Sequence, residues 1–247
     1  MDPACLGSWL FFILFGAVAI WQAYQRGRSP IELVIAGFIH SFTFILLILT
    51  ARDPGYLATG SEDPDLRFCA KCNFRQPLRT KHCADCGRCV ATHDHHCFYI
   101  GGCVGERNHR MFYFLLVFGN VATLWDFDIF ISIVSHRALH SSGSVIASGV
   151  LIGVLVFPVI VVVGLVAYHT YLISSAQTTW EHLSRANITY YKDIPSSVRL
   201  FGDGVLLNIS NFFRRSHSAE PIRWTPKWKV GDKLDFSVFD NEHYNCC

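Results

Sequence analysis

The stretch Cys69–Cys103, CAKCNFRQPLRTKHCADCGRCVATHDHHCFYIGGC, governs how the rest of the chain is interpreted. It holds seven of the ten cysteines of the chain and four of its twelve histidines. Strongly apolar segments lie on both sides of it. A cluster this dense is a metal site, a disulfide scaffold or a reactive centre.

The composition around this stretch is typical of a membrane protein. The chain has 247 residues, of which 51% are hydrophobic and 16% charged, whereas soluble domains carry about 25% charged residues. The net charge of +2 is too small to indicate a nucleic-acid partner. The lipid bilayer is therefore the first expected partner.

Four apolar segments are long enough for helices that cross a bilayer, which takes roughly 20 residues each. They cover about residues 6–23, 31–50, 111–134 and 145–173. The predicted fold class is thus a mainly α membrane protein, a four-transmembrane-helix bundle with a cysteine-rich domain between helices 2 and 3. The predicted parts are a hairpin ending in Asp53-Pro54-Gly55 (1–55), the cysteine-rich domain with an acidic linker at 56–68 (56–110), the second helix pair (111–174) and a tail (175–247).

Basic residues predict the orientation of these helices. The loop that carries the cysteines and the C-terminal tail each hold nine Lys and Arg, against three in the connections on the other side. The positive-inside rule then places the cysteine-rich domain and both termini in the cytosol. Disulfides are disfavoured there, so the clustered thiols indicate metal binding or catalysis.

The spacing of the cysteines and histidines predicts two zinc sites. Zinc takes four soft ligands in a tetrahedron, and a closed Cys3His set is a structural site. The eight strongest ligand candidates are Cys69, Cys72, His82, Cys83, Cys86, Cys89, His96 and Cys103. A zinc hydrolase is disfavoured, because sites closed by protein ligands leave no position for water.

One cysteine of the stretch, Cys97, is left over by this assignment. His95 is placed to take its proton, and Asp94 to orient His95 and stabilise its cationic form, as in a nucleophile–base–orienter triad. A neighbouring cationic histidine lowers a thiol pKa from about 8.5 into the range where thiolate exists at neutral pH. The alternative is that Cys97 is a spare zinc ligand.

A reactive thiol at the cytosolic membrane surface suits long-chain acyl-coenzyme A as a substrate. Attack on its thioester gives a new thioester on Cys97, from which a second thiol accepts the acyl group in two-step transfer. Arg79 and Lys81 are candidates for contacts with the phosphates of the coenzyme. They equally suit positive-inside charges.

The motif Asp94-His95-His96-Cys97, within this cysteine pattern, resembles the DHHC protein S-acyltransferases, or palmitoyltransferases. The similarity extends to Cys103, Val104, Gly105, Asn108 and Phe112, to Asp53-Pro54-Gly55, to the T-T-x-E motif at Thr178, Thr179 and Glu181, and to Asn208. It departs from the family at Phe98-Tyr99, where Pro-Trp is usual, and at Gly101-Gly102, where Asn-Asn is commoner. These departures predict an altered rate or substrate preference.

The resemblance implies the roles of particular residues. One structural zinc ion would be held by Cys69, Cys72, His82 and Cys89, and the other by Cys83, Cys86, His96 and Cys103. Cys97 would be the acylated nucleophile, His95 its base, and Thr179 would steady Asp94. Asn208 would help dock the tail, and the acyl chain would lie between the four spans. The expected partners are membrane-associated proteins with cytosolic cysteines, and the expected location is endomembranes, the Golgi or ER first.

Several alternatives remain at this level. A catalytically silent zinc-containing membrane adaptor shares every feature except turnover, and a transporter is supported only by Asn120, Asp126 and Asp128. The two aspartates are expected near the far membrane face or pointing into the bundle.

An amphipathic turn at 206–213 suits either the membrane surface or packing on the soluble domain. Three further cysteines suit either lipidation or free thiols: Cys5, Cys246 and Cys247.

Overall fold

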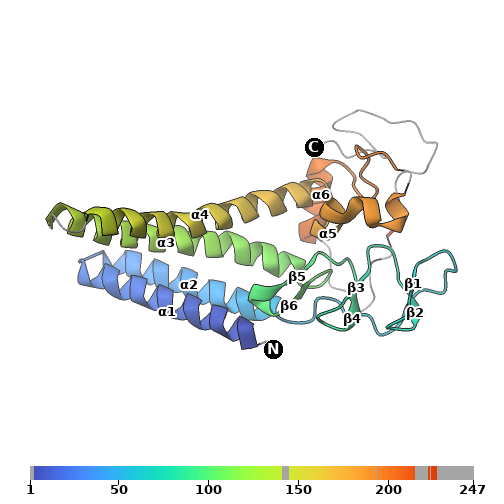
Figure 1. The fold of residues 1–247 in the computed structure, drawn as a ribbon, viewed down its shortest axis with the longest axis horizontal. Helices are drawn as coiled ribbons and strands as arrows, with labels where there is room; N and C mark the ends of the chain where they lie inside the picture. The colour runs from blue at the N-terminus through green and yellow to red at the C-terminus, as the bar shows by residue number, and fades with distance from the viewer. Residues whose placement is uncertain (1–2, 141–144, 193, 215–221, 223, 227–247) are drawn as a thin grey trace. The chain divides into compact units, whose positions relative to one another are not determined.

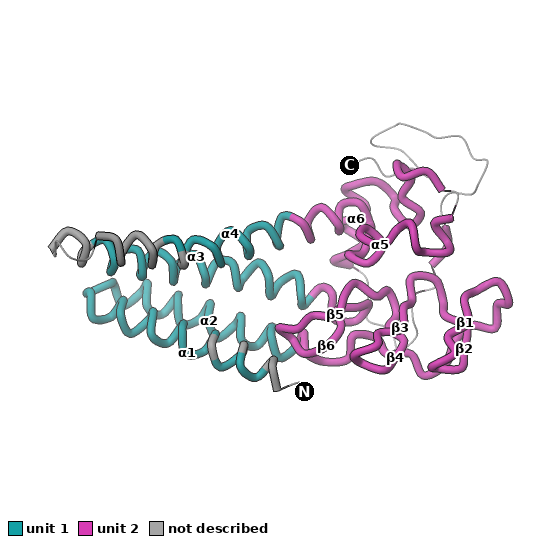
Figure 2. The backbone as a smooth tube through the Cα atoms, viewed as in Figure 1, with its two compact units in different colours: residues 1–49, 111–167 teal, residues 50–110, 168–247 magenta. Residues whose placement is uncertain are grey.

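The computed structural model describes residues 3–140, 145–192, 194–214, 222 and 224–226 (Figure 1). Its long helices are α1 (Pro3–Gln25), α2 (Pro30–Thr50), α3 (His109–His140) and α4 (Val145–Ser174). The chain divides into two compact units, residues 1–49 with 111–167 and residues 50–110 with 168–247 (Figure 2). The side chain of Cys5, together with Cys246 and Cys247, lies outside the described part.

The first unit consists of the long helices, and the chain is a mainly helical membrane protein. Three helical segments are long and apolar enough to span a bilayer: Pro30–Thr50, His109–Ser135 and Val156–Ser174. The described apolar part of α1, Phe12–Gln25, is shorter, so the predicted fourth span stays a prediction. Helix α3 continues to His140, beyond the predicted end at residue 134.

Aromatic and polar contacts join the helices of the first unit. The rings of Phe15 and Phe130 stack with their centroids 4.7 Å apart, which links α1 to α3. The two aspartates of α3 have different settings. Asp126 is buried and accepts a hydrogen bond of 3.2 Å from His40 Nε2, whereas Asp128 is exposed and pairs with Arg28 at 2.6 Å. One therefore points into this unit and the other reaches the polar turn after α1.

The second unit contains three antiparallel β-hairpins. Strand β1 (Phe68–Cys69) pairs with β2 (Phe74–Arg75), β3 (Lys81–Cys83) with β4 (Arg88–Val90), and β5 (His95–Cys97) with β6 (Gly102–Val104). The segment 56–68, predicted to be a linker, contacts this domain. Tyr56 forms a bridge with Val90, and Ser61 forms one with Arg75, so this stretch packs against the cysteine-rich domain.

Asparagine and aspartate side chains fix the turns at both ends of that domain. Asp53 Oδ1 accepts hydrogen bonds of 2.9 Å from the backbone of Gly55 and Tyr56, which closes the turn after α2. Asn108 Nδ2 donates to the carbonyls of Thr50 and Cys103 at 2.8 and 2.9 Å. These bonds attach the start of α3 to the end of α2 within the second unit.

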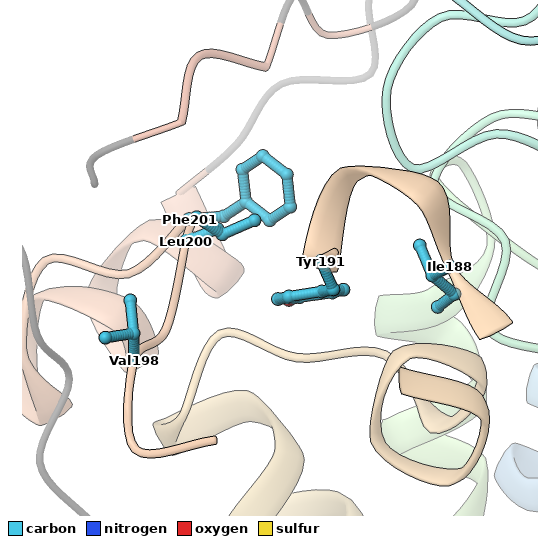
Figure 3. Close-up of a cluster of buried hydrophobic side chains, with 5 residues drawn as sticks. All are labelled: Ile188, Tyr191, Val198, Leu200 and Phe201. Atoms are coloured by element: carbon cyan, nitrogen blue, oxygen red, sulfur yellow. The ribbon is translucent and has the colours of Figure 1, made fainter. Parts of the chain in front are cut away.

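The tail packs on the cysteine-rich domain through a small apolar core. Its buried members are Ile188, Tyr191, Val198, Leu200 and Phe201 (Figure 3). Leu78, Trp180, Tyr190 and Trp224 pack around them. In the described part of the tail, α4 is followed by the short helices α5 (Thr179–Ser184) and α6 (Val205–Arg214), with the 3-10 helices η2 (Arg185–Asn187) and η3 (Thr189–Tyr191) between them. On α6, Leu206 and Leu207 are exposed whereas Asn208 is buried.

Candidate catalytic and metal-binding site

The eight predicted ligands form two separate groups of four. In the first group, Nδ1 of His82 lies 3.7, 3.3 and 3.8 Å from the sulfurs of Cys69, Cys72 and Cys89. In the second, Nδ1 of His96 lies 3.5, 3.4 and 3.7 Å from those of Cys83, Cys86 and Cys103. The grouping is the one that the sequence resemblance implied, and within each group the ligand atoms lie within 4.8 Å of one another.

These distances fit a tetrahedral zinc ion. With Zn–S of about 2.3 Å and Zn–N of about 2.0 Å, tetrahedral geometry separates nitrogen and sulfur by about 3.5 Å. Both histidines are within a few tenths of an ångström of that value. The sulfurs of Cys86 and Cys103 are 3.5 Å apart, whereas a disulfide bond measures about 2.05 Å. The seven described cysteines are all free of disulfides.

The hairpins explain why these ligands converge. His82 lies opposite Cys89 across β3 and β4, and His96 lies opposite Cys103 across β5 and β6. Side chains of directly opposed residues stand on the same face with Cβ atoms about 5 Å apart. Each hairpin therefore presents one histidine and one cysteine to a site, and each C-x2-C turn supplies the other two sulfurs.

Cys97, the ninth candidate, lies at the end of β5 and belongs to neither group. It is buried and forms a side-chain hydrogen bond with His95. His95 Nδ1 donates to Asp94 Oδ2 at 2.6 Å. The three side chains thus form a connected nucleophile, base and carboxylate, and the position of Cys97 does not support the spare-ligand alternative.

Asp94 is held from a second direction by α5. The backbone N–H of Thr179 donates to Asp94 Oδ1 at 2.8 Å, and its hydroxyl donates to Oδ2 at 2.7 Å. The backbone N–H of Trp180 donates to the carbonyl of Asp94 at 3.0 Å. A fully buried carboxylate with this many donors is ionised and fixed in orientation.

The electrostatics favour a charged His95–Cys97 pair. Burial opposes the cationic form of His95, but the hydrogen bonds to Asp94 and Cys97 and their charges raise its pKa to about 9. Burial likewise opposes the thiolate, yet the hydrogen bond and charge of His95 lower the pKa of Cys97 below its usual value. Burial would raise the pKa of Asp94, but His109 and the hydrogen bond from His95 hold it well below the usual range.

Two histidines of this site were not found from the sequence. His109 Nε2 lies 3.7 Å from Asp94 Oδ1, and the ring of His169 lies 5.9 Å from that of His95. They come from the start of α3 and the end of α4. No spacing rule relates residues on these two helices to Asp94, and only tertiary packing within the second unit brings them together.

A model of the DHHC palmitoyltransferase family matches residues 62–186, about half of the chain. The chain belongs to the DHHC palmitoyltransferase family. The match includes both ligand groups, the Asp94–Cys97 motif and the Thr178–Glu181 motif. A search among curated proteins found no match.

The outer motifs of this palmitoyltransferase-family chain have defined structural places. Thr178 caps α5, since its side chain accepts from the backbone N–H of Glu181 while the Glu181 side chain accepts from the N–H of Thr178. Asn208 Nδ2 donates to the carbonyl of Ser174 at 2.7 Å, and its Oδ1 accepts from Asp203 N at 2.7 Å. Asn208 therefore ties α6 to the end of α4.

Arg79 and Lys81, the two candidates for contacts with coenzyme phosphates, both lie near residues of the tail. Arg79 is buried and pairs with Glu181, so the geometry does not favour a contact with coenzyme phosphates or an exposed positive-inside charge. Its fixed partner could not be recognised from the sequence, because it lies 102 residues further along the chain. Lys81 Nζ lies 5.5 Å from the ring centroid of Trp180, beside the domain core.

The residues that depart from the family pattern follow the nucleophile directly. Phe98 and Tyr99 are 56% and 67% exposed and form the 3-10 turn η1 (Phe98–Ile100). Gly101 ends this turn with φ of 65°, in the left-handed region that favours glycine. The two aromatic side chains are thus presented beside Cys97 instead of being packed in the core.

Proposed function

We propose that this chain is a protein S-acyltransferase that moves a long-chain fatty acyl group, palmitoyl first, from acyl-coenzyme A to cysteine thiols of proteins. The observation that carries the proposal is the buried chain of hydrogen bonds from Thr179 through Asp94 and His95 to Cys97. It supplies a thiolate and a proton donor in contact with each other, which is what thioester exchange needs.

In the first half-reaction, the Cys97 thiolate attacks the carbonyl carbon of the acyl thioester. A bond forms between that carbon and the sulfur of Cys97, and the bond to the coenzyme sulfur breaks when the tetrahedral adduct collapses. The coenzyme leaves as a thiol after it takes the proton from His95. Asp94 keeps the ring in the tautomer that presents Nε2 to the reacting sulfur atoms.

In the second half-reaction, neutral His95 accepts the proton of the incoming cysteine thiol. The new thiolate attacks the acyl group on Cys97, and the bond between the acyl carbon and the sulfur of Cys97 breaks. Cys97 returns as a thiolate beside cationic His95. No electrons are exchanged, and one thioester replaces another, so the acyl-Cys97 intermediate forms and decays at little net cost.

The two Cys3His groups are proposed to hold two structural zinc ions. Zinc would bind the eight ligands as a closed cross-link between the hairpins, with no open position. His96 would be a ligand next to both His95 and Cys97, so metal binding at the second group would fix the strand that carries the base and the nucleophile. Cys97 itself stays outside both sets.

The membrane setting supports a lipid-linked substrate. We propose the cytosolic orientation of the cysteine-rich domain and both termini, on the charge asymmetry of the loops, and a location in endomembranes, the Golgi or ER first. The acyl chain would lie among the four predicted spans, and the acceptors would be membrane-associated proteins with cytosolic cysteines.

Two-substrate kinetics of the purified full chain in lipid nanodiscs test the proposal. With palmitoyl-coenzyme A and a peptide carrying a single cysteine, we expect the parallel double-reciprocal lines of a ping-pong reaction, and no transfer by Cys97→Ser. The variant should keep its metal content, which shows that it is folded. Transfer that persists in Cys97→Ser would overturn the proposal, and a folded wild type without any transfer would favour the adaptor alternative.

A further inference from the structure

Arg79 forms a buried ion pair that the reaction itself does not use. Its Nε donates to Glu181 Oε1 at 2.8 Å, and its Nη2 donates to Oε2 at 2.5 Å. Only 4% of Arg79 is exposed and none of Glu181. The guanidinium also lies over the rings of Phe201 and Trp224, 4.7 and 4.3 Å from their centroids. This bidentate geometry gives the pair a fixed orientation as well as charge compensation.

The Glu181 carboxylate has other donors beside the guanidinium. Its Oε1 accepts from the hydroxyl of Tyr190 at 3.0 Å, and its Oε2 accepts from the backbone N–H of Thr178 at 2.9 Å. A buried ion pair is a weak source of stability, because desolvation offsets the attraction between the charges. Such a pair can instead favour one conformation of the groups around it. Here those groups form the first turn of α5.

That turn carries the contact with the catalytic carboxylate. Glu181 is the third residue of α5, and Thr179, the first, donates two hydrogen bonds to Asp94. On the other side of the contact, the carbonyl of Arg79 accepts from the N–H of His93, the residue before Asp94. Arg79 thus bonds through its side chain to the helix that donates to Asp94, and through its backbone to the loop that carries Asp94.

The backbone of Arg79 is adapted to this position. Its φ is 64°, in the left-handed region that few residues other than glycine adopt. Such a conformation persists only where the surrounding contacts determine it, and it is common at functional sites. An arginine that served only as a surface charge would not need a buried partner or a strained backbone.

We propose that Arg79 is a positioning residue for acyl transfer: its ion pair with Glu181 holds Thr179 against Asp94, and thereby sets the orientation of His95. The inference rests on the proposed reaction through Cys97. The proposal assigns Arg79 an effect on the rate of the chemical step. From the sequence, it had been a candidate for contacts with coenzyme phosphates. Loss of the pair should lower the rate of Cys97 acylation without weakening the binding of the acyl-coenzyme A.

The test is single-turnover acylation of Cys97 over a range of palmitoyl-coenzyme A concentrations. Arg79→Lys keeps the charge but loses the bidentate geometry. We expect its maximal rate to fall about 10-fold to 100-fold, the cost of a small misplacement of a catalytic group. The half-saturating concentration should stay within about twofold of the wild type. In a Thr179→Val background the Arg79 substitution should add less than about threefold, because residues that act through one contact are not additive.

A matched control is Arg185→Lys in the same tail. Its guanidinium lies 4.0 Å from the ring centroid of Tyr191 and donates to the carbonyls of Pro195 and Val198. Neither of these hydrogen bonds involves Thr179, which donates to Asp94. We expect the wild-type maximal rate for this variant, whatever its thermal stability. A loss as large as that of Arg79→Lys would show a general effect of stability and overturn the proposal.

Two other outcomes would contradict the role of Arg79. A raised half-saturating concentration with an unchanged maximal rate would indicate a phosphate contact, and losses that multiply with Thr179→Val would show an independent effect. If Arg79→Lys does not retain metal, the neutral pair Arg79→Gln with Glu181→Gln replaces it, since no unpaired charge is then buried, and must show the same dependence on Thr179. A wild type that forms no acyl-Cys97 would instead refute the proposed function.

Discussion

Replacing Asp94 by asparagine tests the electrostatic account of the site in a nearly isosteric way. Asp94 is fully buried and receives hydrogen bonds from His95 Nδ1 and from the backbone and hydroxyl of Thr179. All of these groups donate, so one of them must face the amide NH2 of the variant. The least costly adjustment is for cationic His95 to lose its Nδ1 proton, which leaves a neutral ring that accepts from the amide NH2 and keeps its remaining proton on Nε2, toward Cys97.

The size of the effect follows from the pKa of His95. That pKa is raised to about 9, compared with 6.5 for the free side chain, and the difference corresponds to about 3 kcal/mol, or roughly 300-fold. This gives the order of magnitude for Asp94→Asn, because Cys97 contributes to the same rise whereas burial of the ring opposes it. We therefore expect the single-turnover acylation rate at neutral pH to fall between about 30-fold and 300-fold.

The pH dependence of the acylation rate tests the same account independently, through the direction in which its basic limb moves. In the wild type, cationic His95 is retained until the pH rises through about 9, and thiolate is lost as the pH falls through the lowered pKa of Cys97. In Asp94→Asn the basic limb should move down toward 6.5, the value of the free side chain. The assay is rapid-quench labelling with radioactive palmitoyl-coenzyme A in nanodiscs. A rate within about threefold of wild type with an unchanged basic limb would refute the reasoning.

Two further substitutions test the metal sites and the packing of the domain. Cys72→Ser should lower the bound zinc from two ions per chain to one and reduce the melting temperature, whereas Cys97→Ser should keep both; metal analysis of the purified chains decides this. Gly105→Ala should destabilise the second unit by about 1–3 kcal/mol, because its Cβ would lie 2.7 Å from the carbonyl oxygen of Pro54, whereas Gly102→Ala meets nothing within 4 Å. Thermal unfolding of the two glycine variants should separate them, and equal melting temperatures would contradict the packing argument.

The parts of the site that the sequence predicted are those set by local geometry. The ligand residues repeat at C-x2-C turns and across short hairpins, so their spacing carried the prediction of two four-ligand sites, and the family resemblance supplied the grouping that the structure brings together. Membership of the DHHC family is confirmed. The membrane character is confirmed for three apolar helices, while the fourth span stays a prediction.

The parts that were missed depend on contacts between distant segments. His109 and His169 reach Asp94 because the start of α3 and the end of α4 belong to the second unit, where tertiary packing brings them to the hairpins. Arg79 was interpreted from its charge alone, and a charge does not reveal that its partner is Glu181. The two aspartates of α3 were weighed as a pair, but side chains two residues apart on a helix point about 200° apart. The structure accordingly buries Asp126 against His40 and leaves Asp128 exposed.

The central claim is that the acyl group passes through Cys97, and a pulse–chase experiment measures this most directly. The full chain is loaded with labelled palmitoyl-coenzyme A, freed of excess substrate and then mixed with a cysteine peptide. We predict a hydroxylamine-sensitive label on the tryptic peptide that contains Cys97, and its stoichiometric transfer to the acceptor thiol. Label that forms on another cysteine, or label on Cys97 that is not discharged by the acceptor, would contradict the account.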